Sequence, residues 1–304
     1  MIPSAFDYHS PKTLSEAVGL LVELGKSGEE AKILSGGQSL LPLLKLRFAA
    51  PGHLVDIGRI PDLDYLKEEG GFLKIGALVR EAALESSPLV RARYPILVDT
   101  AEVIADPIVR NLSTVCGNLA HGDPANDHPA TMLAVGAEVT ALGPRGARTI
   151  PVKLLFTGVF TTALEVTEVL TEIRIPVPPP GSGGAYLKLE RKVGDFATAG
   201  AAAFLVLGGG VIEHAGIGLT NLGPTPIKAL DAEQFLRGKA PDAASFAEAA
   251  RRAAAATSPT PDRRGSVEYK REMARVLTTR ALAKAAARAT SPAKPAPPQK
   301  GAPA

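Results

Sequence analysis

Apolar positions recur along this chain either at helical spacing or in short runs typical of buried strands. The first helical stretch starts at Thr13, which forms a capping box with Glu16, and we expect it to end at Gly25. Its apolar face consists of Leu14, Val18, Leu21 and Leu24. Short apolar runs predict strands at residues 31–34, 53–57, 72–77 and 169–175, and a hairpin at 138–152. Further helices are expected at residues 40–46, 78–84, 89–104 and 131–135.

A segment rich in proline and glycine, PVPPPGSGG at residues 176–184, divides the chain into two parts. Beyond it, apolar runs predict a three-stranded antiparallel sheet with strands at residues 186–191, 199–207 and 211–219. Helices are then expected at residues 229–236, 243–256 and 266–288. We therefore predict one domain at 1–177, a second at 178–288 and a disordered tail of low complexity at 289–304.

The composition limits what the chain can do alone. Its 304 residues suffice for two or three packed domains, and a net charge of +3 is too small to indicate nucleic-acid binding. No apolar run reaches the roughly 18 residues that cross a bilayer, and the N-terminal segment lacks the features of a secretory signal. The single cysteine, Cys116, excludes an internal disulfide. An iron–sulfur cluster usually needs four thiolates, so this chain cannot hold a cluster by itself.

Residues 31–47 have the layout of an anion-binding turn. Strand residues 31–34 are followed by a glycine pair, hydroxyl groups and the start of an apolar helix. Glycines allow positive φ and a close approach of backbone N–H groups, and a helix start favours negative charge. The candidate binding residues are Ser35, Gly36, Gly37, Gln38, Ser39 and Leu40. From these residues alone, an ordinary strand-to-helix turn explains the pattern equally well.

A second segment, TVCGNLAHGDPANDHP at residues 114–129, has similar ingredients: small residues, a Gly-Asn pair and a hydroxyl. We expect a loop here, because these residue types are typical of loops. Two such loops in one domain can hold the two phosphates of a dinucleotide. The candidate binding residues are Thr114, Val115, Cys116, Gly117 and Asn118.

Three blocks, in this order, resemble a known family, the FAD-binding subunits of molybdenum hydroxylases. SGGQSLLPLLKLR is similar to that family's A-G-G-x-S-L-x-P motif, and TVCGNLAHGDPANDHPA to its T-I-G-G-N-x-x-x-x-x-P-x-x-D motif. AYLKLERKVGDFATAGAA, from Ala185, resembles its tyrosine-lysine-arginine segment, and GDPAND and RKVGDFATAG look most like the carbon monoxide dehydrogenase branch.

The resemblance covers nearly the whole chain and implies an α+β fold. It implies a PCMH-type FAD-binding domain of two α/β subdomains, at about 1–55 and 56–177. The C-terminal domain would then combine the three-stranded sheet with a helical bundle.

The resemblance also implies roles for single residues. Asp127 matches the family aspartate that accepts hydrogen bonds from ribityl hydroxyls, and Asp123 is a second candidate. Capping of the next helix is the alternative for both. Cys116 stands where the family usually has glycine, so it must avoid positive φ, and its effect on the loop stays open.

In the third block, Tyr186 and Phe196 are candidates for packing beside the isoalloxazine ring, and Lys188 for contact with its polar edge. An ordinary strand with one solvated face is the alternative. The spacing of His121 and His128 matches no ordinary metal motif, so no metal site is predicted. No general base or nucleophile stands out, so no catalytic residue is predicted either.

Taken as a relay, the chain would pass electrons through FAD. The resemblance implies a small [2Fe-2S] partner subunit as donor, a large partner subunit with the molybdenum cofactor, and a dimer of heterotrimers. We expect a cytoplasmic location and leave open a peripheral attachment of the complex to the inner membrane face. Carbon monoxide is the first choice of substrate, and a purine, an aldehyde or an N-heterocycle are the alternatives. The identity of the electron acceptor also stays open.

Two alternatives to the relay remain from the sequence. One is a self-contained flavin-dependent oxidoreductase of the same fold, which would turn over a substrate without partners. The other is a non-catalytic nucleotide-binding assembly protein, which would hold no reversibly reducible flavin. Fold resemblance alone does not identify a substrate.

Overall fold

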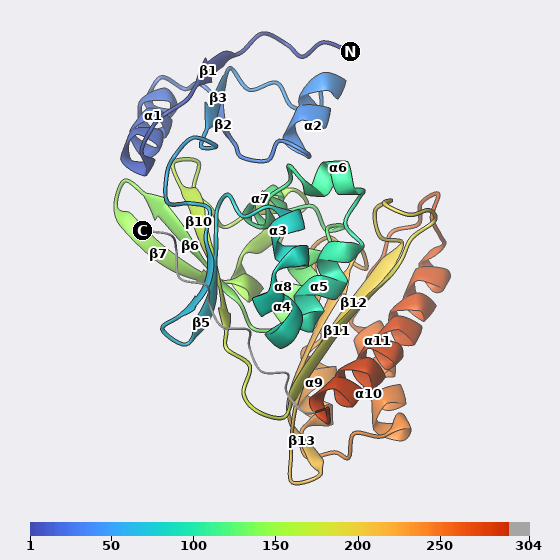
Figure 1. The fold of residues 1–304 in the computed structure, drawn as a ribbon. Helices are drawn as coiled ribbons and strands as arrows, with labels where there is room; N and C mark the ends of the chain where they lie inside the picture. The colour runs from blue at the N-terminus through green and yellow to red at the C-terminus, as the bar shows by residue number, and fades with distance from the viewer. Residues whose placement is uncertain (292–304) are drawn as a thin grey trace.

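The computed structural model describes residues 1–291, which form three main sheets that follow one another along the chain (Figure 1). The N-terminal lobe, at the top of Figure 1, has a parallel sheet of order β1-β3-β2. Thr13 caps α1 as predicted, by accepting a hydrogen bond from the Glu16 N–H at 3.1 Å, but the Glu16 carboxylate accepts from the Lys12 N–H at 2.7 Å rather than from Thr13 as in a full capping box. The elements of the lobe are β1 (Asp7–His9), α1 (Leu14–Lys26), β2 (Ala31–Leu34), α2 (Leu40–Leu46) and β3 (His53–Asp56).

The middle of the molecule has an antiparallel sheet of order β4-β5-β10-β6-β7. Figure 1 shows helices between this sheet and the third sheet. The strands are β4 (Leu66–Glu69), β5 (Phe72–Gly76), β6 (Glu138–Gly143), β7 (Gly146–Pro151) and β10 (Val169–Pro176), with a small ribbon of β8 (Phe156–Gly158) and β9 (Thr161–Thr162). The helices are α3 (Glu81–Ser86), α4 (Pro88–Arg93), α5 (Pro95–Glu102), α6 (Pro107–Arg110), α7 (Val115–His121), α8 (His128–Ala134) and the 3₁₀ turn η1 (Val152–Leu154).

Two predicted helices of this region were wrong in their extent. The helix expected at 89–104 is two helices, α4 and α5, separated at Tyr94, whose φ of −130° and ψ of 53° are not helical. Pro95 explains the break, because a residue before proline is pushed out of the helical region. The helix expected at 78–84 begins only at Glu81, since Arg80 is extended and bridges to Thr114.

The third sheet has four strands in the order β11-β12-β13-β14, not the three that we predicted. The added strand, β14 (Ile227–Lys228), is two residues long and pairs with the end of β13, too short for any periodicity to reveal it. The other strands are β11 (Ser182–Leu189), β12 (Ala199–Gly208) and β13 (Val211–Thr220), and the helices are α9 (Leu230–Leu236), α10 (Ala243–Ala255) and α11 (Val267–Ala289). Of the predicted tail, residues 289–291 complete and follow α11, and the rest lies outside the described residues.

Helices cover both faces of this third sheet. On one face, an alanine-rich core joins the sheet to α10 and α11. On the other face, α8 packs directly on β13, because a Cβ added at Gly216 or Gly218 would lie 1.9 Å from the carbonyl oxygen of Ala134 or Ala130. This glycine pair brings the C-terminal part of the chain against the helix that follows the second predicted loop.

No helix among residues 1–291 combines the length and the apolar character of a membrane-spanning segment.

Candidate cofactor site

The first glycine segment forms the predicted strand, turn and helix. β2 ends at Leu34, and the chain reverses through Gly37, whose φ of +74° is in the left-handed region that favours glycine. α2 then starts at Leu40, with Ser39 before it making no side-chain capping bond. Gln38 folds back, and its Nε2 donates to the Gly36 carbonyl at 3.3 Å. The backbone N–H groups of this turn are therefore not occupied by a side-chain cap of α2.

The second segment is not the loop that we predicted, because residues 115–121 form helix α7. Thr114 caps this helix by accepting a hydrogen bond from the Gly117 N–H at 3.2 Å. A Cβ at position 117 would lie 2.6 Å from Thr114 Oγ1, so glycine leaves room for the cap. The helix ends at Gly122, in the left-handed region with a φ of +66°.

Cys116 lies inside α7 with a helical backbone and a buried side chain. It therefore avoids positive φ at the position where the family has glycine. Burial raises the pKa of its thiol, which keeps the sulfur protonated and unreactive.

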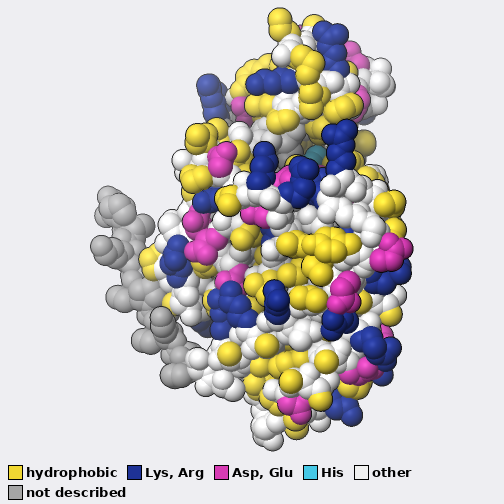
Figure 2. All heavy atoms as spheres, turned by 90° about the vertical axis from the view of Figure 1, so that its right-hand side faces the viewer, with side chains coloured by type: hydrophobic (Ala, Val, Ile, Leu, Met, Phe, Trp, Pro, Cys, Tyr) yellow, Lys and Arg dark blue, Asp and Glu magenta, His cyan; other side chains and the backbone are white. Residues whose placement is uncertain are grey.

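The two segments meet. Ser35 Oγ lies 3.1 Å from Thr114 Oγ1, within hydrogen-bond distance. A Cβ added at Gly36 would lie 2.4 Å from the Leu112 carbonyl oxygen, so only glycine permits this approach. Figure 1 places the start of α2 above α6 and α7, and Figure 2 shows that the surface is hollowed between the N-terminal lobe and the rest of the molecule.

Two buried polar atoms beside this junction lack hydrogen-bond partners among the described residues and could bind a polar group of a ligand. Within residues 1–291, the buried Oγ of Ser113 and Oδ1 of Asn118 make no hydrogen bond. Buried polar atoms without partners are costly, so such atoms indicate a missing partner. A cofactor with hydroxyl and amide donors would satisfy them.

The loop after α7 carries the two aspartates. Asp123 Oδ1 accepts a hydrogen bond from the Ala125 N–H at 2.8 Å and so shapes the turn. Asp127 precedes α8 but makes no side-chain capping bond. Its buried carboxylate accepts hydrogen bonds from the Tyr186 hydroxyl and from Lys188 Nζ, the latter at 3.0 Å. Capping is therefore not what the Asp127 side chain does.

Burial raises the pKa of Asp127, and the positive charge of Lys188 acts against this effect. Lys188 is itself buried and also donates to the Val103 carbonyl at 2.8 Å. A buried ammonium needs such partners, so Asp127 and Lys188 hold each other in place.

Tyr186 and Phe196, the candidates for packing beside the flavin ring, lie in different environments. Tyr186 is only 2% exposed and belongs to the core of the middle domain, so its ring stands behind Asp127. Phe196 is 50% exposed on the segment between β11 and β12. A direct contact of the Tyr186 ring with a ligand would need a movement, whereas Phe196 is accessible.

Two residues of the site that we did not predict follow from the end of β13. Thr220 Oγ1 donates to the Asn126 carbonyl at 3.2 Å, and the Asn221 N–H donates to the Pro124 carbonyl at 2.9 Å. The only signal in the sequence is asparagine directly after a strand, a residue that tolerates left-handed backbone. The C-terminal domain thus holds the loop that carries Asp123 and Asp127.

His128 forms a pair with Glu81, in which Nε2 and Oε2 are 2.7 Å apart and both side chains are fully buried. Among the residues that the structure describes, no three His, Cys, Asp or Glu side chains are grouped so that they could hold a metal ion.

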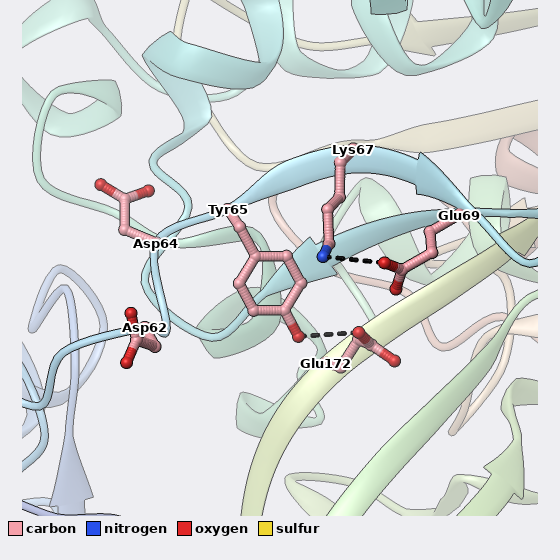
Figure 3. A pocket seen from close by; sticks show the side chains of 6 residues that line it. All are labelled: Asp62, Asp64, Tyr65, Lys67, Glu69 and Glu172. Atoms are coloured by element: carbon pink, nitrogen blue, oxygen red, sulfur yellow. Dashed lines mark hydrogen bonds and ion pairs between the residues drawn. The ribbon is translucent and has the colours of Figure 1, made fainter. Parts of the chain in front are cut away.

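A separate pocket of about 420 Å³ lies on the middle sheet (Figure 3). Tyr65 donates to Glu172 Oε2 at 2.7 Å, and Lys67 Nζ lies 3.1 Å from Glu69 Oε1. The pocket is lined by Asp62, Asp64, Tyr65, Lys67, Glu69 and Glu172. Its four carboxylates would repel the phosphates of a dinucleotide, so it is not the candidate site.

Comparison with known proteins identifies both halves of the chain. Residues 4–178 match the family described as FAD binding domain in molybdopterin dehydrogenase. Residues 184–285 match the CO dehydrogenase flavoprotein C-terminal domain.

Two proteins that match this chain over nearly its whole length are medium chains of carbon monoxide dehydrogenases. The carbon monoxide dehydrogenase medium chain of Hydrogenophaga pseudoflava is 48% identical over 95% of this chain and 99% of its own length. That of Afipia carboxidovorans is 47% identical with the same coverage. The crystal structure of carbon monoxide dehydrogenase from Hydrogenophaga pseudoflava, lacking the Mo-pyranopterin moiety of its cofactor, superposes with a TM-score of 0.91 at 50% identity, covering 95% of this chain and 99% of that one.

Proposed function

We propose a function from the family to which this chain belongs, the FAD-binding subunits of molybdopterin dehydrogenases. The chain is the FAD-binding, medium subunit of a carbon monoxide dehydrogenase. The observation that carries this proposal is the near-complete coverage of two medium chains at 47 and 48% identity, together with the α+β fold they imply. When bound, FAD supplies the redox chemistry, while the protein supplies binding and electrostatics.

The pyrophosphate binds where the two segments meet. The turn from Ser35 to Leu40 presents its backbone N–H groups, and Gly36 and Gly37 keep side chains out of the way. Residues 114–118, including the Val115 and Cys116 backbone, form the opposite wall, and Asn118 Oδ1 is an acceptor that would suit a hydroxyl of the cofactor rather than a phosphate oxygen.

Residues of the loop after α7 and of the C-terminal domain would hold the ribityl chain and the ring. Asp127 accepts hydrogen bonds from ribityl hydroxyls, while Tyr186 and Lys188 hold its carboxylate in one orientation. Asp123 fixes the turn before it. Lys188, which is buried between Asp127 and Glu190, would act on the polar edge of the ring through this charged cluster, and Phe196 would pack beside the ring.

The proposed partners rest on the relatives, which are medium chains, and on the single cysteine of this chain. Because one thiolate cannot hold a [2Fe-2S] cluster, the electrons for its flavin come from a second, small subunit. A large subunit holds the molybdenum cofactor, and the complex is a dimer of heterotrimers in the cytoplasm. We also propose a domain boundary near residue 177, which limited proteolysis between β10 and β11 would locate.

The test is purification of the tagged chain from its native host under mild conditions. We expect two co-purifying subunits, bound FAD, iron and molybdenum, and reduction of a dye by carbon monoxide. The dissociated chain should oxidise no carbon monoxide, although its flavin should reduce with dithionite. Carbon monoxide oxidation by this chain with FAD alone would instead favour a self-contained oxidoreductase, and absence of a reducible flavin would favour an assembly protein.

The placement of the pyrophosphate has its own test. In Gly37→Val, a β-branched residue must adopt a backbone φ of +74°, with its Cβ 3.1 Å from Leu41 Cδ1, so we expect a folded complex without FAD. Stoichiometric flavin at unchanged affinity in this variant would place the pyrophosphate elsewhere.

A further inference from the structure

Asn221 joins two segments that are far apart in the sequence. It follows β13 with a φ of +56°, a left-handed conformation that asparagine tolerates better than most residues with a side chain. Its N–H donates to the Pro124 carbonyl at 2.9 Å, and its Nδ2 donates to the Ala197 carbonyl at 2.6 Å. One residue therefore contacts both the loop of Asp123 and Asp127 and the segment that carries Phe196.

The segment 190–198, which we call the Phe196 arm, is also anchored by the buried Ala197 and by polar contacts. Asp195 Oδ1 accepts a hydrogen bond from Arg264 Nη2 at 2.8 Å, and Thr198 N–H donates to the Leu189 carbonyl at 2.7 Å. A Cβ added at Gly194 would lie 3.0 Å from the Ala105 carbonyl oxygen, so the arm also rests on residue 105.

The tip of the arm is open to solvent. Val193 is 91% exposed and Phe196 is 50% exposed, so no core contact fixes either side chain. The position of Phe196 then depends on the backbone on either side of it. On the C-terminal side, one residue beyond Phe196, Asn221 holds the carbonyl of Ala197, whose side chain is buried.

We propose that Asn221 is a positioning residue, which sets the spacing between the loop that carries Asp123 and Asp127 and the Phe196 arm. This spacing in turn sets how the isoalloxazine ring fits between the two segments. The inference rests on the proposed function, because it takes FAD as the group that lies between the two segments. Asn221 combines a left-handed backbone with a side-chain donor. Glycine at this position keeps the backbone and loses the donor, and aspartate places an acceptor against the Ala197 carbonyl.

The experiment compares Asn221→Gly and Asn221→Asp in the complex purified from the host. The readouts are the rate at which FAD dissociates on dilution, followed by flavin fluorescence, and the visible circular dichroism of the bound flavin. Loss of a neutral hydrogen bond should speed dissociation in Asn221→Gly about two- to ten-fold. Asn221→Asp should release FAD faster still, and both variants should change the dichroism of the flavin.

Asp242→Ala is the matched control for simple loss of stability. Asp242 caps α10 in the same domain by accepting a hydrogen bond from the Ser245 N–H at 2.8 Å, and it contacts neither segment. Its loss should lower the Tm and leave the flavin readouts unchanged.

Three results would overturn the inference. Wild-type FAD dissociation and dichroism in Asn221→Gly would refute it while leaving the proposed function intact. Equal acceleration in Asp242→Ala would reduce Asn221 to a general stabilising residue. A wild-type complex without FAD would refute both the inference and the proposed function. Glycine adopts the left-handed backbone conformation of residue 221 without strain, so we expect Asn221→Gly to fold. This variant alone decides the test even if Asn221→Asp fails to fold.

Discussion

The hydroxyl oxygens of Ser35 and Thr114 lie 3.1 Å apart, although 79 residues separate them in the sequence. Ser35 begins the turn after β2, and Thr114 caps α7, so the contact joins the N-terminal lobe to the middle domain. The backbone is equally close here, because Gly36 faces the carbonyl of Leu112. In the proposed function, residues of both lobes would therefore line the dinucleotide site.

Gly36→Ala should therefore separate the two lobes. Its Cβ would lie 2.4 Å from the Leu112 carbonyl oxygen and 2.8 Å from Ser113 Cα, and backbone atoms cannot turn aside as a flexible side chain can. We expect a loss of stability of about 1–3 kcal/mol, as for other overpacked sites, together with loss of FAD. Thermal melting and flavin content measure the two effects.

Gly19→Ala is the control for this variant. Gly19 is an exposed residue of α1 with no atom within 4 Å of its added Cβ, and alanine is the better helix former. We expect a gain of about 0.5–1 kcal/mol and unchanged FAD. Equal flavin content in Gly36→Ala and wild type would show that the junction is not the cofactor site.

Asp127→Ala should weaken both the flavin and the fold. A hydrogen bond to a charged acceptor contributes about 1.5–3 kcal/mol, so FAD affinity should fall roughly ten- to a hundred-fold. The change also removes the nearer of the two carboxylates beside the buried Lys188, whose Nζ keeps Glu190 Oε2 at 3.3 Å, so we expect a loss of about 1–3 kcal/mol of stability. Titration with FAD and chemical denaturation measure the two separately.

Tyr186→Phe separates the roles of Asp127. This variant removes one hydrogen bond to the carboxylate but leaves Lys188 in contact with it, so FAD affinity should change much less than in Asp127→Ala. If the two variants bound FAD equally well at different stabilities, Asp127 would support the fold alone.

Gly218→Ala should loosen the contact between β13 and α8. The added Cβ would lie 1.9 Å from the Ala130 carbonyl oxygen, inside a helix that cannot shift without disturbing Asp127. We expect a loss of stability of about 2–3 kcal/mol and weaker FAD binding.

Gly208→Ala is the control for Gly218→Ala, because the distance from its added Cβ to the nearest atom is the same. Its Cβ would also lie 1.9 Å from a neighbour, but that neighbour is the carboxylate end of the exposed Glu213 side chain, which can rotate away. We expect less than about 1 kcal/mol of loss and normal FAD. Equal destabilisation by both substitutions would contradict the close packing of α8 on the sheet.

Local features of this fold could be predicted from the sequence, and features that depend on distant contacts could not. The helix cap at Thr13 and the strand, glycine and helix order of residues 31–46 are contained in a few neighbouring residues, and the structure has both. α7 was missed because Gly117 and Asn118 are poor helix formers, and only the capping threonine indicated a helix. β14 forms because its two residues pair with β13, and the sequence of these two residues alone does not predict a strand.

The arrangement of the site shows the same limit. Asp127 could be chosen as a ligand residue from its family motif, but its buried contacts with Tyr186 and Lys188 span 59 and 61 residues of sequence. Thr220 and Asn221 stand outside all three motifs and reach the site only because β13 ends there. Pairings of this kind depend on how the domains pack, and no local pattern expresses that.

The ion pair that anchors the Phe196 arm should give a pH-dependent stability. The hydrogen bond from Arg264, assisted by Arg191, lowers the pKa of Asp195 to about 2. Since an unfolded aspartate titrates near pH 3.9, the folded protein binds this proton less readily than the unfolded chain. The pair therefore stabilises the fold fully above about pH 4, and its contribution is lost as the pH falls toward 2.

Arg264→Ala tests this window against wild type. The two proteins should differ by about 1 kcal/mol in free energy of unfolding at pH 7, since both partners are partly accessible to solvent. Between pH 4 and pH 2 the difference should shrink, because protonated Asp195 no longer needs a cation. Arg264→Lys keeps the charge and should retain most of the pH dependence. Urea denaturation at a series of pH values measures it, and a difference that stayed constant down to pH 2 would mean that Arg264 stabilises the arm by packing rather than by charge.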